Sequence, residues 1–292
     1  MRKVICIFIA MLIAVTARAE ETIRLFMVGN SFSANATKYL EEIAKADGCK
    51  VVLGIANIGG GSMDDHWRGV REHQRDPEKG KLYAGCSLEE MLKREEWDVV
   101  TIQQRSATSA KLGTYRPYAK YLYDFIKTNA PQAEIRMHQT WAYRADDVGY
   151  KDGYLQADMH KAIRENFHTI AGELGVLIVP VGEAFAKVLT DPEWAFTRDS
   201  KFDYTNPVYP GLPDELRSLN VGAQWKDGKF WVDTHHASPL GEYLGSAVFF
   251  EALFGRSVVG NSYVPAGISA EDVAFFQRIA HDIVKDIKNI KP

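Results

Sequence analysis

Five short apolar runs alternate with segments of helical periodicity along this chain, and the alternation restricts the fold more than any other feature. Each run has six or eight residues and is typical of a buried strand. The runs span residues 23–28, 50–57, 97–102, 134–141 and 176–181. Strands that alternate with helices usually form a parallel sheet with helices on both faces. The sequence therefore predicts an α/β fold with a central five-stranded parallel sheet.

Helical periodicity appears between the runs and again after the last one. Apolar side chains recur at helical spacing over residues 36–44, 118–126, 163–174, 241–254 and 271–288. Gly175 marks the end of the third helix. Because the chain contains no internal repeat and no low-complexity linker, residues 20–292 are predicted to form a single domain.

The first nineteen residues have the pattern of a signal peptide. Arg2 and Lys3 precede the apolar run "VICIFIAMLIAV", and Ala17-Arg18-Ala19 supplies a small-residue cleavage site. This run is shorter than the roughly 20 residues of a membrane-spanning helix, although an uncleaved anchor is the alternative. Residues 1–19 are predicted to be removed, which leaves an exported protein without a membrane attachment. A glycosylation sequon at 35–37, directly after a candidate site, favours a bacterial secreted or periplasmic protein.

The charge of the chain limits its possible binding partners, and its cysteines leave one disulfide possible. The formal net charge is −3, and no basic stripe indicates binding to nucleic acid or an anionic membrane surface. Cys49 and Cys86 remain after the predicted cleavage. They either pair in an oxidising compartment or stay as two separate thiols, because the sequence does not place their Cα atoms.

An irregular segment at residues 190–231 interrupts the alternation. It is rich in proline, glycine and aromatic residues, and "WKDGKFW" predicts a hairpin around Asp227-Gly228. A segment of this length in a compact domain is usually functional or a small subdomain. The predicted domain therefore carries an aromatic-rich insertion before its last two helices.

Polar residues follow the ends of the predicted strands. Gly29-Asn30-Ser31 follows the first strand, residues 57–62 follow the second, Gln103-Gln104-Arg105-Ser106 follows the third and Thr140-Trp141 ends the fourth. Ligands of open parallel sheets bind beyond the carboxyl ends of the strands. These segments are therefore expected to converge on one crevice.

Ser31 is the candidate nucleophile of that crevice. A serine nucleophile needs a histidine base and an acid that orients the base. Asp233 and His236, three residues apart in "WVDTHHASPLGEYLG", have the spacing for such a pair. Three other interpretations stay open: Ser31 only caps a helix, Asp233 only caps a turn beside a buried His236, or both bind a metal with His235.

The motifs "GNSF", "GGGSM", "IQQRS" and Asp233-x-x-His236 resemble, in this order, the SGNH/GDSL hydrolase superfamily, and in particular a bacterial secreted branch of largely unassigned function. The resemblance implies a three-layer α/β/α flavodoxin-like fold and ester hydrolysis through an acyl-serine. It implies that Ser31 is the nucleophile, His236 the base and Asp233 its orienting acid. It further implies an oxyanion hole formed by the backbone N–H of Ser31, by Gly60 or one of its glycine neighbours, and by a side-chain amide.

Two motifs depart from the family pattern. Gly29-Asn30-Ser31 replaces Gly-Asp-Ser, and Gln103-Gln104 stands where the family has Gly-x-Asn-Asp. A glutamine amide donates hydrogen bonds as asparagine does. Gln103 is therefore expected to complete the oxyanion hole, with Gln104 as the alternative. Asn30, Gln104 and Trp141 are expected to contact the substrate.

These observations predict a secreted serine esterase that removes acetyl groups from a carbohydrate, with a small-molecule or glycan ester as substrate and no metal or organic cofactor. A carbohydrate-binding or weakly catalytic protein of the same fold is the main alternative. A glycoside hydrolase using Asp64 and Asp65 is less favoured, because adjacent carboxylates on one helical turn point apart. Gly59-Gly60-Gly61 is not followed by the Lys-Ser/Thr of a phosphate-binding loop.

Overall fold

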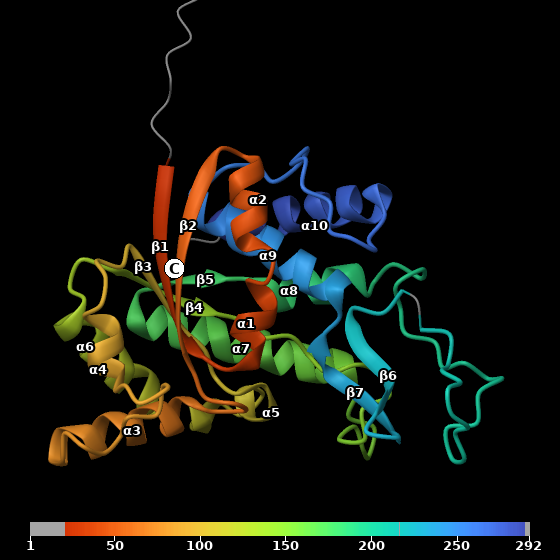
Figure 1. Cartoon of the computed structure of the whole chain (residues 1–292), viewed down its shortest axis with the longest axis horizontal. Helices are drawn as coiled ribbons and strands as arrows, with labels where there is room; N and C mark the ends of the chain where they lie inside the picture. Colours follow the sequence, from red (N-terminus) through yellow and green to blue (C-terminus); the bar gives the residue numbers. More distant parts are fainter. Residues whose placement is uncertain (1–20, 216, 290–292) are drawn as a thin grey trace, which may run out of the picture.

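The computed structural model describes residues 21–215 and 217–289, so the predicted signal peptide lies outside the described residues. The centre is a five-stranded parallel sheet in the order β2-β1-β3-β4-β5, which confirms the predicted fold class (Figure 1). The strands are β1 (Glu21–Gly29), β2 (Cys49–Asn57), β3 (Val99–Ile102), β4 (Glu134–His138) and β5 (Leu177–Val179).

The strand register brings the three N-terminal candidate motifs together. β1 and β2 pair over their full lengths, so that Gly29 lies opposite Asn57. The backbone N–H of Gln103 donates to the carbonyl of Val28 at 3.2 Å, which places the end of β3 at the same level. The turns after β1, β2 and β3 therefore leave the sheet at one edge, as expected for a crevice beyond the carboxyl ends.

Each face of the sheet is covered by its own group of helices, because successive side chains of a strand point to opposite faces. Leu25 and Met27 of β1 pack in one core, whereas Phe26 and Val28 pack in the other. The first core is closed by α1 (Ser31–Ala36), α2 (Leu40–Ala46), α8 (Val181–Val188), α9 (Pro239–Phe254) and α10 (Ala270–Asn289). The second is closed by α3 (Met63–Arg75), α4 (Leu88–Leu92), α6 (Tyr118–Asn129) and α7 (Gln156–Leu174).

Two short elements, α5 (Ser106–Ser109) and η1 (Leu112–Thr114), follow β3. Several boundaries differ from the prediction; β3, for example, begins at Val99 instead of residue 97. The helix predicted over 36–44 is two helices, α1 and α2, separated by a turn at residues 37–39, and both pack against the same buried helix α9. β4 ends at His138 instead of residue 141, and β5 ends before Pro180, which cannot donate to a strand neighbour. None of the helices within 21–215 and 217–289 is long and apolar enough to cross a bilayer.

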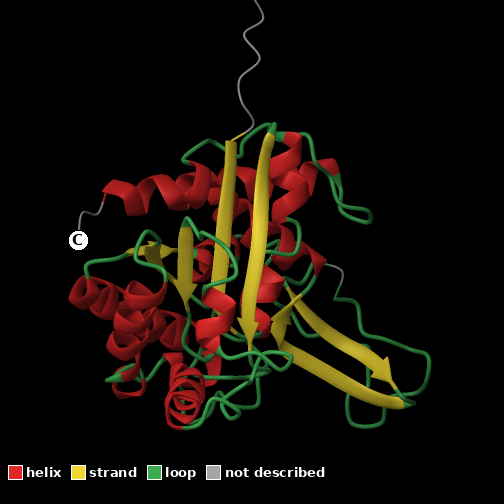
Figure 2. Ribbon diagram, turned by 60° about the vertical axis from the view of Figure 1, so that its left-hand side comes forward, coloured by secondary structure: helices red, strands yellow, loops and turns green. Residues whose placement is uncertain are grey.

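The predicted hairpin is present. β6 (Asn220–Lys226) and β7 (Lys229–Ala237) pair antiparallel around Asp227 and Gly228, whose φ angles of 50° and 70° match a two-residue primed turn. Figure 2 shows this pair as a separate two-stranded sheet beside the central one. β7 leads back to the central sheet and ends next to α1.

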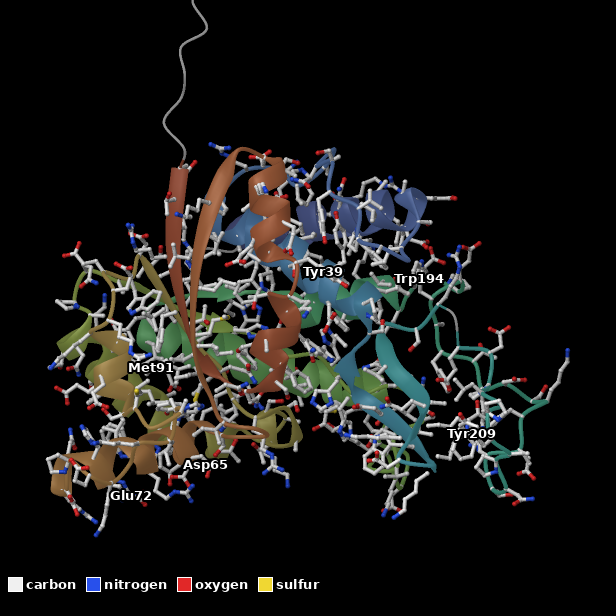
Figure 3. The ribbon with its side chains drawn as sticks, viewed as in Figure 1. Tyr39, Asp65, Glu72, Met91, Trp194 and Tyr209 are labelled. Carbon is white, nitrogen blue, oxygen red and sulfur yellow. The ribbon has the colours of Figure 1, made fainter. Side chains whose placement is uncertain are left out.

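The segment before the hairpin contains neither helix nor strand over 190–215 and 217–219. Trp194 is buried and stacks on Phe275 of α10, while Tyr209 lies at the outer part of the segment (Figure 3).

Cys49 begins β2 and Cys86 lies before α4, and both thiols are free. The open question of a disulfide between them is thus answered in the negative.

Candidate active site

Asn30 directs the chain from β1 into α1 and thereby presents Ser31. Asn30 has an extended backbone, and its side-chain oxygen accepts the backbone N–H of Phe32 at 3.0 Å, as an N-cap does. Ser31 is the first residue of α1 and is partly exposed. Because Asn30 is the cap, Ser31 is left free of the capping role that the sequence left open.

A chain of two hydrogen bonds links the three predicted catalytic side chains. Ser31 Oγ lies 2.8 Å from Nε2 of His236, and Nδ1 of His236 lies 2.8 Å from Oδ2 of Asp233. The other oxygen of Asp233 accepts the backbone N–H of His235 at 3.0 Å and of His236 at 2.9 Å. The carboxylate therefore holds the imidazole through Nδ1 and leaves Nε2 facing the serine. Ser31 and His236 come together although they lie 205 positions apart in the sequence.

The electrostatics of this pair favour a charged carboxylate beside a basic imidazole. Burial raises the pKa of Asp233, but the hydrogen bonds from the side chain and backbone of His236 and from the backbone of His235 outweigh it and lower the pKa far below its ordinary value. The hydrogen bond to Asp233 raises the pKa of His236 above 6.5, against the opposing effect of burial. The imidazole is thus a stronger proton acceptor than a free histidine.

Ser31 opens into a pocket of about 200 Å³. The pocket is lined by Asn30, Ser31, Phe32, Gly60, Arg105, Ser106, Ala107, Tyr143, His235 and His236. Among the described residues, no hydrogen-bond acceptor is paired with the backbone N–H of Ser31 or of Gly60. Gly61 is different, because its N–H donates to Ile58 at 2.7 Å. These two free N–H groups are backbone donors for a negative charge that forms beside Ser31.

Gln103 does not line this pocket, contrary to the expectation for the oxyanion hole. Its side chain is buried, and its Nε2 donates to Oδ1 of Asn30 at 2.7 Å. Its Oε1 accepts Oγ–H of Ser33 at 2.5 Å. The amide is used beneath the pocket to fix the turn that carries Ser31, and it supports the site without facing a substrate.

Gln104 also has a structural position instead of the expected substrate contact. Its Oε1 accepts the backbone N–H groups of Met63 at 3.1 Å and Arg105 at 2.8 Å. Its Nε2 donates to the carbonyl of Thr114 at 2.7 Å. The side chain is buried and its amide is fully engaged, so it holds the start of α3 to the segment after β3.

Trp141 is a third residue whose surroundings differ from the expectation. Its ring is fully buried between Phe32, at a centroid distance of 4.2 Å, and Phe185, at 4.5 Å. Its Nε1 donates to the backbone carbonyl of His235 at 2.8 Å. Trp141 therefore supports the end of β7 that carries His236 and has no surface for a sugar ring.

Asn30 does line the pocket, as expected for a substrate contact, but its amide is occupied. Besides accepting from Phe32 and Gln103, it donates through Nδ2 to the carbonyl of Gly61 at 2.9 Å. The side chain thus ties the Ser31 turn to the Gly60 turn.

The sequence suggested His235 only as a possible metal ligand, and the structure places it at the pocket. Its Nε2 lies 2.8 Å from Oδ2 of Asp147, and its ring lies against that of Tyr143 at a centroid distance of 3.8 Å. Tyr143 in turn contacts Ser106 through its hydroxyl at 3.0 Å. The adjacent pairs His235-His236 and Asp146-Asp147 were the signal in the sequence, but nothing in their spacing links the two segments.

The competing interpretations find little support in the geometry. Asp65 lies at the start of α3 (Figure 3). It forms a capping box with Ser62 and contacts Arg68, so it is not paired with Asp64. The same capping box occupies backbone N–H groups at the start of α3, which a phosphate-binding loop would leave free for the phosphate. Within the described ranges, no group of three His, Cys, Asp or Glu residues is placed to hold a metal ion. A separate hollow of about 430 Å³, near His160 and Glu183, contains none of the three linked residues.

The order of the sheet defines an α/β/α fold of the SGNH-hydrolase type, and the Ser–His–Asp chain lies at the carboxyl end of this sheet. The fold is similar to that of a candidate SGNH hydrolase from Slackia heliotrinireducens, with a TM-score of 0.50 and 24% identity over 79% of this chain and 98% of the other. Residues 24–206 match the family described as Domain of unknown function (DUF4886), and the chain belongs to this family. A crystal structure of a DUF4886 family protein from Bacteroides uniformis ATCC 8492 has a TM-score of 0.72 and 26% identity, covering 91% of this chain and 95% of the other. No curated protein matches the chain.

Proposed function

We propose that this protein is a serine hydrolase that cleaves a carboxylic ester through an acyl-serine. The observation that carries the proposal is the chain of 2.8 Å contacts from Ser31 through His236 to Asp233. A serine that only stabilises a fold does not need an imidazole oriented by a carboxylate and aimed at its hydroxyl. The pocket in front of Ser31 supplies the two free N–H groups that the reaction needs.

In the first half of the reaction, Ser31 Oγ attacks the ester carbonyl carbon while Nε2 of His236 takes the hydroxyl proton. The carbonyl oxygen becomes an oxyanion that the N–H groups of Ser31 and Gly60 stabilise. The C–O bond to the alcohol then breaks, and His236 gives its proton to the leaving alcohol. In the second half, water attacks the acyl-serine, His236 accepts its proton, and the acid leaves as the Ser31 hydroxyl is restored.

The size of the pocket favours a short acyl group. Pockets for drug-sized ligands have volumes of roughly 300–1,000 Å³, whereas this pocket has about 200 Å³. An acetyl group fits that size, and we propose an acetylated carbohydrate as the substrate. The signal-peptide pattern of residues 1–19 supports action outside the cytoplasm, in the periplasm or the medium.

The test is hydrolysis of p-nitrophenyl acetate by the wild type, by Ser31→Ala and by Ser257→Ala. Ser257 is a matched control, because its hydroxyl also lies near a histidine, 3.3 Å from Nδ1 of His281. That same nitrogen contacts Glu251, so no relay exists there. We expect Ser31→Ala to lose activity and Ser257→Ala to keep it.

A fluorophosphonate probe, located by mass spectrometry, should label Ser31 alone. A wild type that is inert on p-nitrophenyl acetate and on acetylated glycans would sink the hydrolase proposal. If such an inert protein still bound glycans, the binding-protein alternative would replace it. Full activity of Ser31→Ala would instead remove the assignment of the nucleophile.

A further inference from the structure

A second, larger hollow adjoins the Ser31 pocket. It has a volume of about 660 Å³, and three of its lining residues, Ala107, Tyr143 and His235, also line the Ser31 pocket. Its other walls come from the loop after β4, from β7 and from the irregular segment. They consist of residues 146–149, Arg198, Tyr204, residues 230–232 and Thr234. An ester whose acyl group fills the small pocket would extend its alcohol half past Tyr143 and His235 into this hollow.

We infer that this hollow binds the alcohol half of the substrate and that this half is a sugar bearing a carboxylate. The inference rests on the proposed function, because it assigns the acyl half to the Ser31 pocket. Its volume lies within the roughly 300–1,000 Å³ range typical of ligand sites, unlike the pocket of Ser31.

Trp231 supplies a flat apolar surface in the hollow. Trp231 is 60% exposed, and no aromatic ring in the described residues stacks on its indole. The neighbouring rings are different, because Phe230 packs on Phe202 at 5.4 Å and Tyr204 packs on Phe202 at 5.0 Å, which holds the hairpin to the irregular segment. An exposed indole at the edge of a hollow is a platform for the apolar face of a ring and offers one N–H donor.

The charges available in the two hollows are positive. Asp146 is paired with Arg144 at 2.7 Å, and Asp147 contacts both His235 and Thr234. The carboxylates of the larger hollow are therefore already engaged by protein groups.

Two arginines, in contrast, remain available. Arg198 at the larger hollow and Arg105 at the smaller are exposed, and neither has a carboxylate within 4.0 Å among the described residues. The guanidinium of Arg198 lies 4.1 Å from the centre of the Tyr204 ring, which restricts its position. Because a guanidinium forms paired hydrogen bonds with a carboxylate, these groups favour an acidic over a neutral sugar.

The experiment compares acetylated polygalacturonate, which is acidic, with acetylated xylan, which is neutral, and uses p-nitrophenyl acetate as an ester that contains neither a sugar nor a carboxylate. The variants are Trp231→Ala and Arg198→Gln, with Arg278→Gln as the control. Arg278 is also an exposed arginine, but it lies on α10 and lines neither hollow.

We expect Trp231→Ala and Arg198→Gln to lower kcat/KM for acetylated polygalacturonate by about tenfold or more, the loss typical of a charged hydrogen bond or a stacked ring. The Arg278→Gln control should remain within about twofold of the wild type on both glycans and on p-nitrophenyl acetate. Arg198→Gln should leave acetylated xylan within about twofold as well, and the wild type should prefer the acidic substrate.

Equal rates on both glycans, or an unchanged kcat/KM of both variants on the acidic one, would overturn the inference while p-nitrophenyl acetate hydrolysis still supports the proposed function. A wild type inactive on p-nitrophenyl acetate would instead count against the proposed function. In that case, calorimetry with unacetylated oligogalacturonate tests the hollow by itself. Binding that is lost in Trp231→Ala supports the assignment of the hollow, and the absence of binding refutes it.

Discussion

Replacing Asp233 by asparagine tests the proposed mechanism most directly, because the substitution keeps the shape of the side chain and reverses one hydrogen bond. Oδ1 of Asp233 accepts two backbone N–H groups, and Oδ2 faces Nδ1 of His236. In Asp233→Asn, the amide oxygen can keep the two backbone bonds only if the NH2 group faces Nδ1. The imidazole proton must then sit on Nε2, which points at Ser31 and can no longer accept its proton.

The opposite orientation of the new amide is less stable. It would place the NH2 group against two backbone donors and sacrifice two hydrogen bonds, at a net cost of about 1 kcal/mol each. The resulting difference of about 2 kcal/mol favours the unproductive tautomer by roughly 30-fold. The lost bond from the carboxylate to the imidazolium, about 1.5–3 kcal/mol, removes a further factor of roughly 10 to 150. We therefore expect kcat/KM at pH 7.5 to fall by about 10³-fold, near the 10⁴-fold typical of such triads.

The pH dependence of the activity provides a second test of Asp233→Asn. The reaction needs neutral His236, whose pKa the carboxylate raises above 6.5, so the activity of the wild type should be lost in acid with a midpoint above pH 6.5. Without the carboxylate this pKa falls, and the acid limb of the residual activity should move to lower pH. Asp227→Asn is the matched control, because it removes the same charge from the turn of the same hairpin, where asparagine tolerates the positive φ of 50°.

The measurement is kcat/KM for p-nitrophenyl acetate from pH 5 to 9, together with the melting temperature of each variant. Asp233→Asn should melt close to the wild type, since both backbone bonds remain. The reasoning is refuted if Asp233→Asn stays within tenfold of the wild type, or if its acid limb coincides with that of the wild type.

Three further substitutions test how the site is supported. Arg144→Met should lower the free energy of unfolding by about 3–5 kcal/mol, because it leaves the partly buried carboxylates Asp146 and Glu215 without their buried partner. Arg116→Met, which breaks the exposed pair with Glu173, should cost less than about 1 kcal/mol in urea titrations, and equal costs would contradict this. Gly245→Ala should destabilise the protein by about 1–3 kcal/mol, because its Cβ would lie 2.8 Å from Cα of Ala36; Gly172→Ala, with open space around it in α7, should instead raise the melting temperature. Gln103→Leu should cost about 1–3 kcal/mol by removing a donor from buried Asn30, and an unchanged melting temperature would show that this bond is unimportant.

The sheet could be predicted because its strands are buried on both faces, so each is a nearly continuous apolar run. The helix boundaries were less accessible, since apolar periodicity continues from α1 into α2 while both pack on α9. The hairpin was visible in Asp227-Gly228, whose residue types suit a primed turn. Local sequence was thus sufficient for those elements whose structure depends mainly on one factor, which is burial for the strands and turn geometry for the hairpin.

The site was predictable only in part. Ser31, Asp233 and His236 follow a recognisable spacing, and the structure brings their side chains together. The role of an amide such as that of Gln103 depends on which partners surround it, because the same group can donate to a substrate or to a neighbouring side chain. Likewise, an aromatic residue at a strand end, such as Trp141, can face a ligand or the core, and only the packing of Phe32 and Phe185 decides.

The two departures from the family pattern depend on one another. Asn30 must accept from Gln103 and donate to the carbonyl of Gly61, which a carboxylate at this position cannot do. Gly29 is needed as well, since a Cβ there would lie 2.8 Å from the Gln103 amide oxygen. Asparagine after Gly29 and glutamine after β3 therefore form one buried unit.

That unit joins the Ser31 turn to the Gly60 turn, and so fixes the two free N–H groups relative to each other. In this chain the amide after β3 stabilises the donors of the pocket instead of serving as one of them. The electrostatic stabilisation of an oxyanion would then rest on backbone groups that are held in place before any substrate binds, which is the condition under which such groups are most effective.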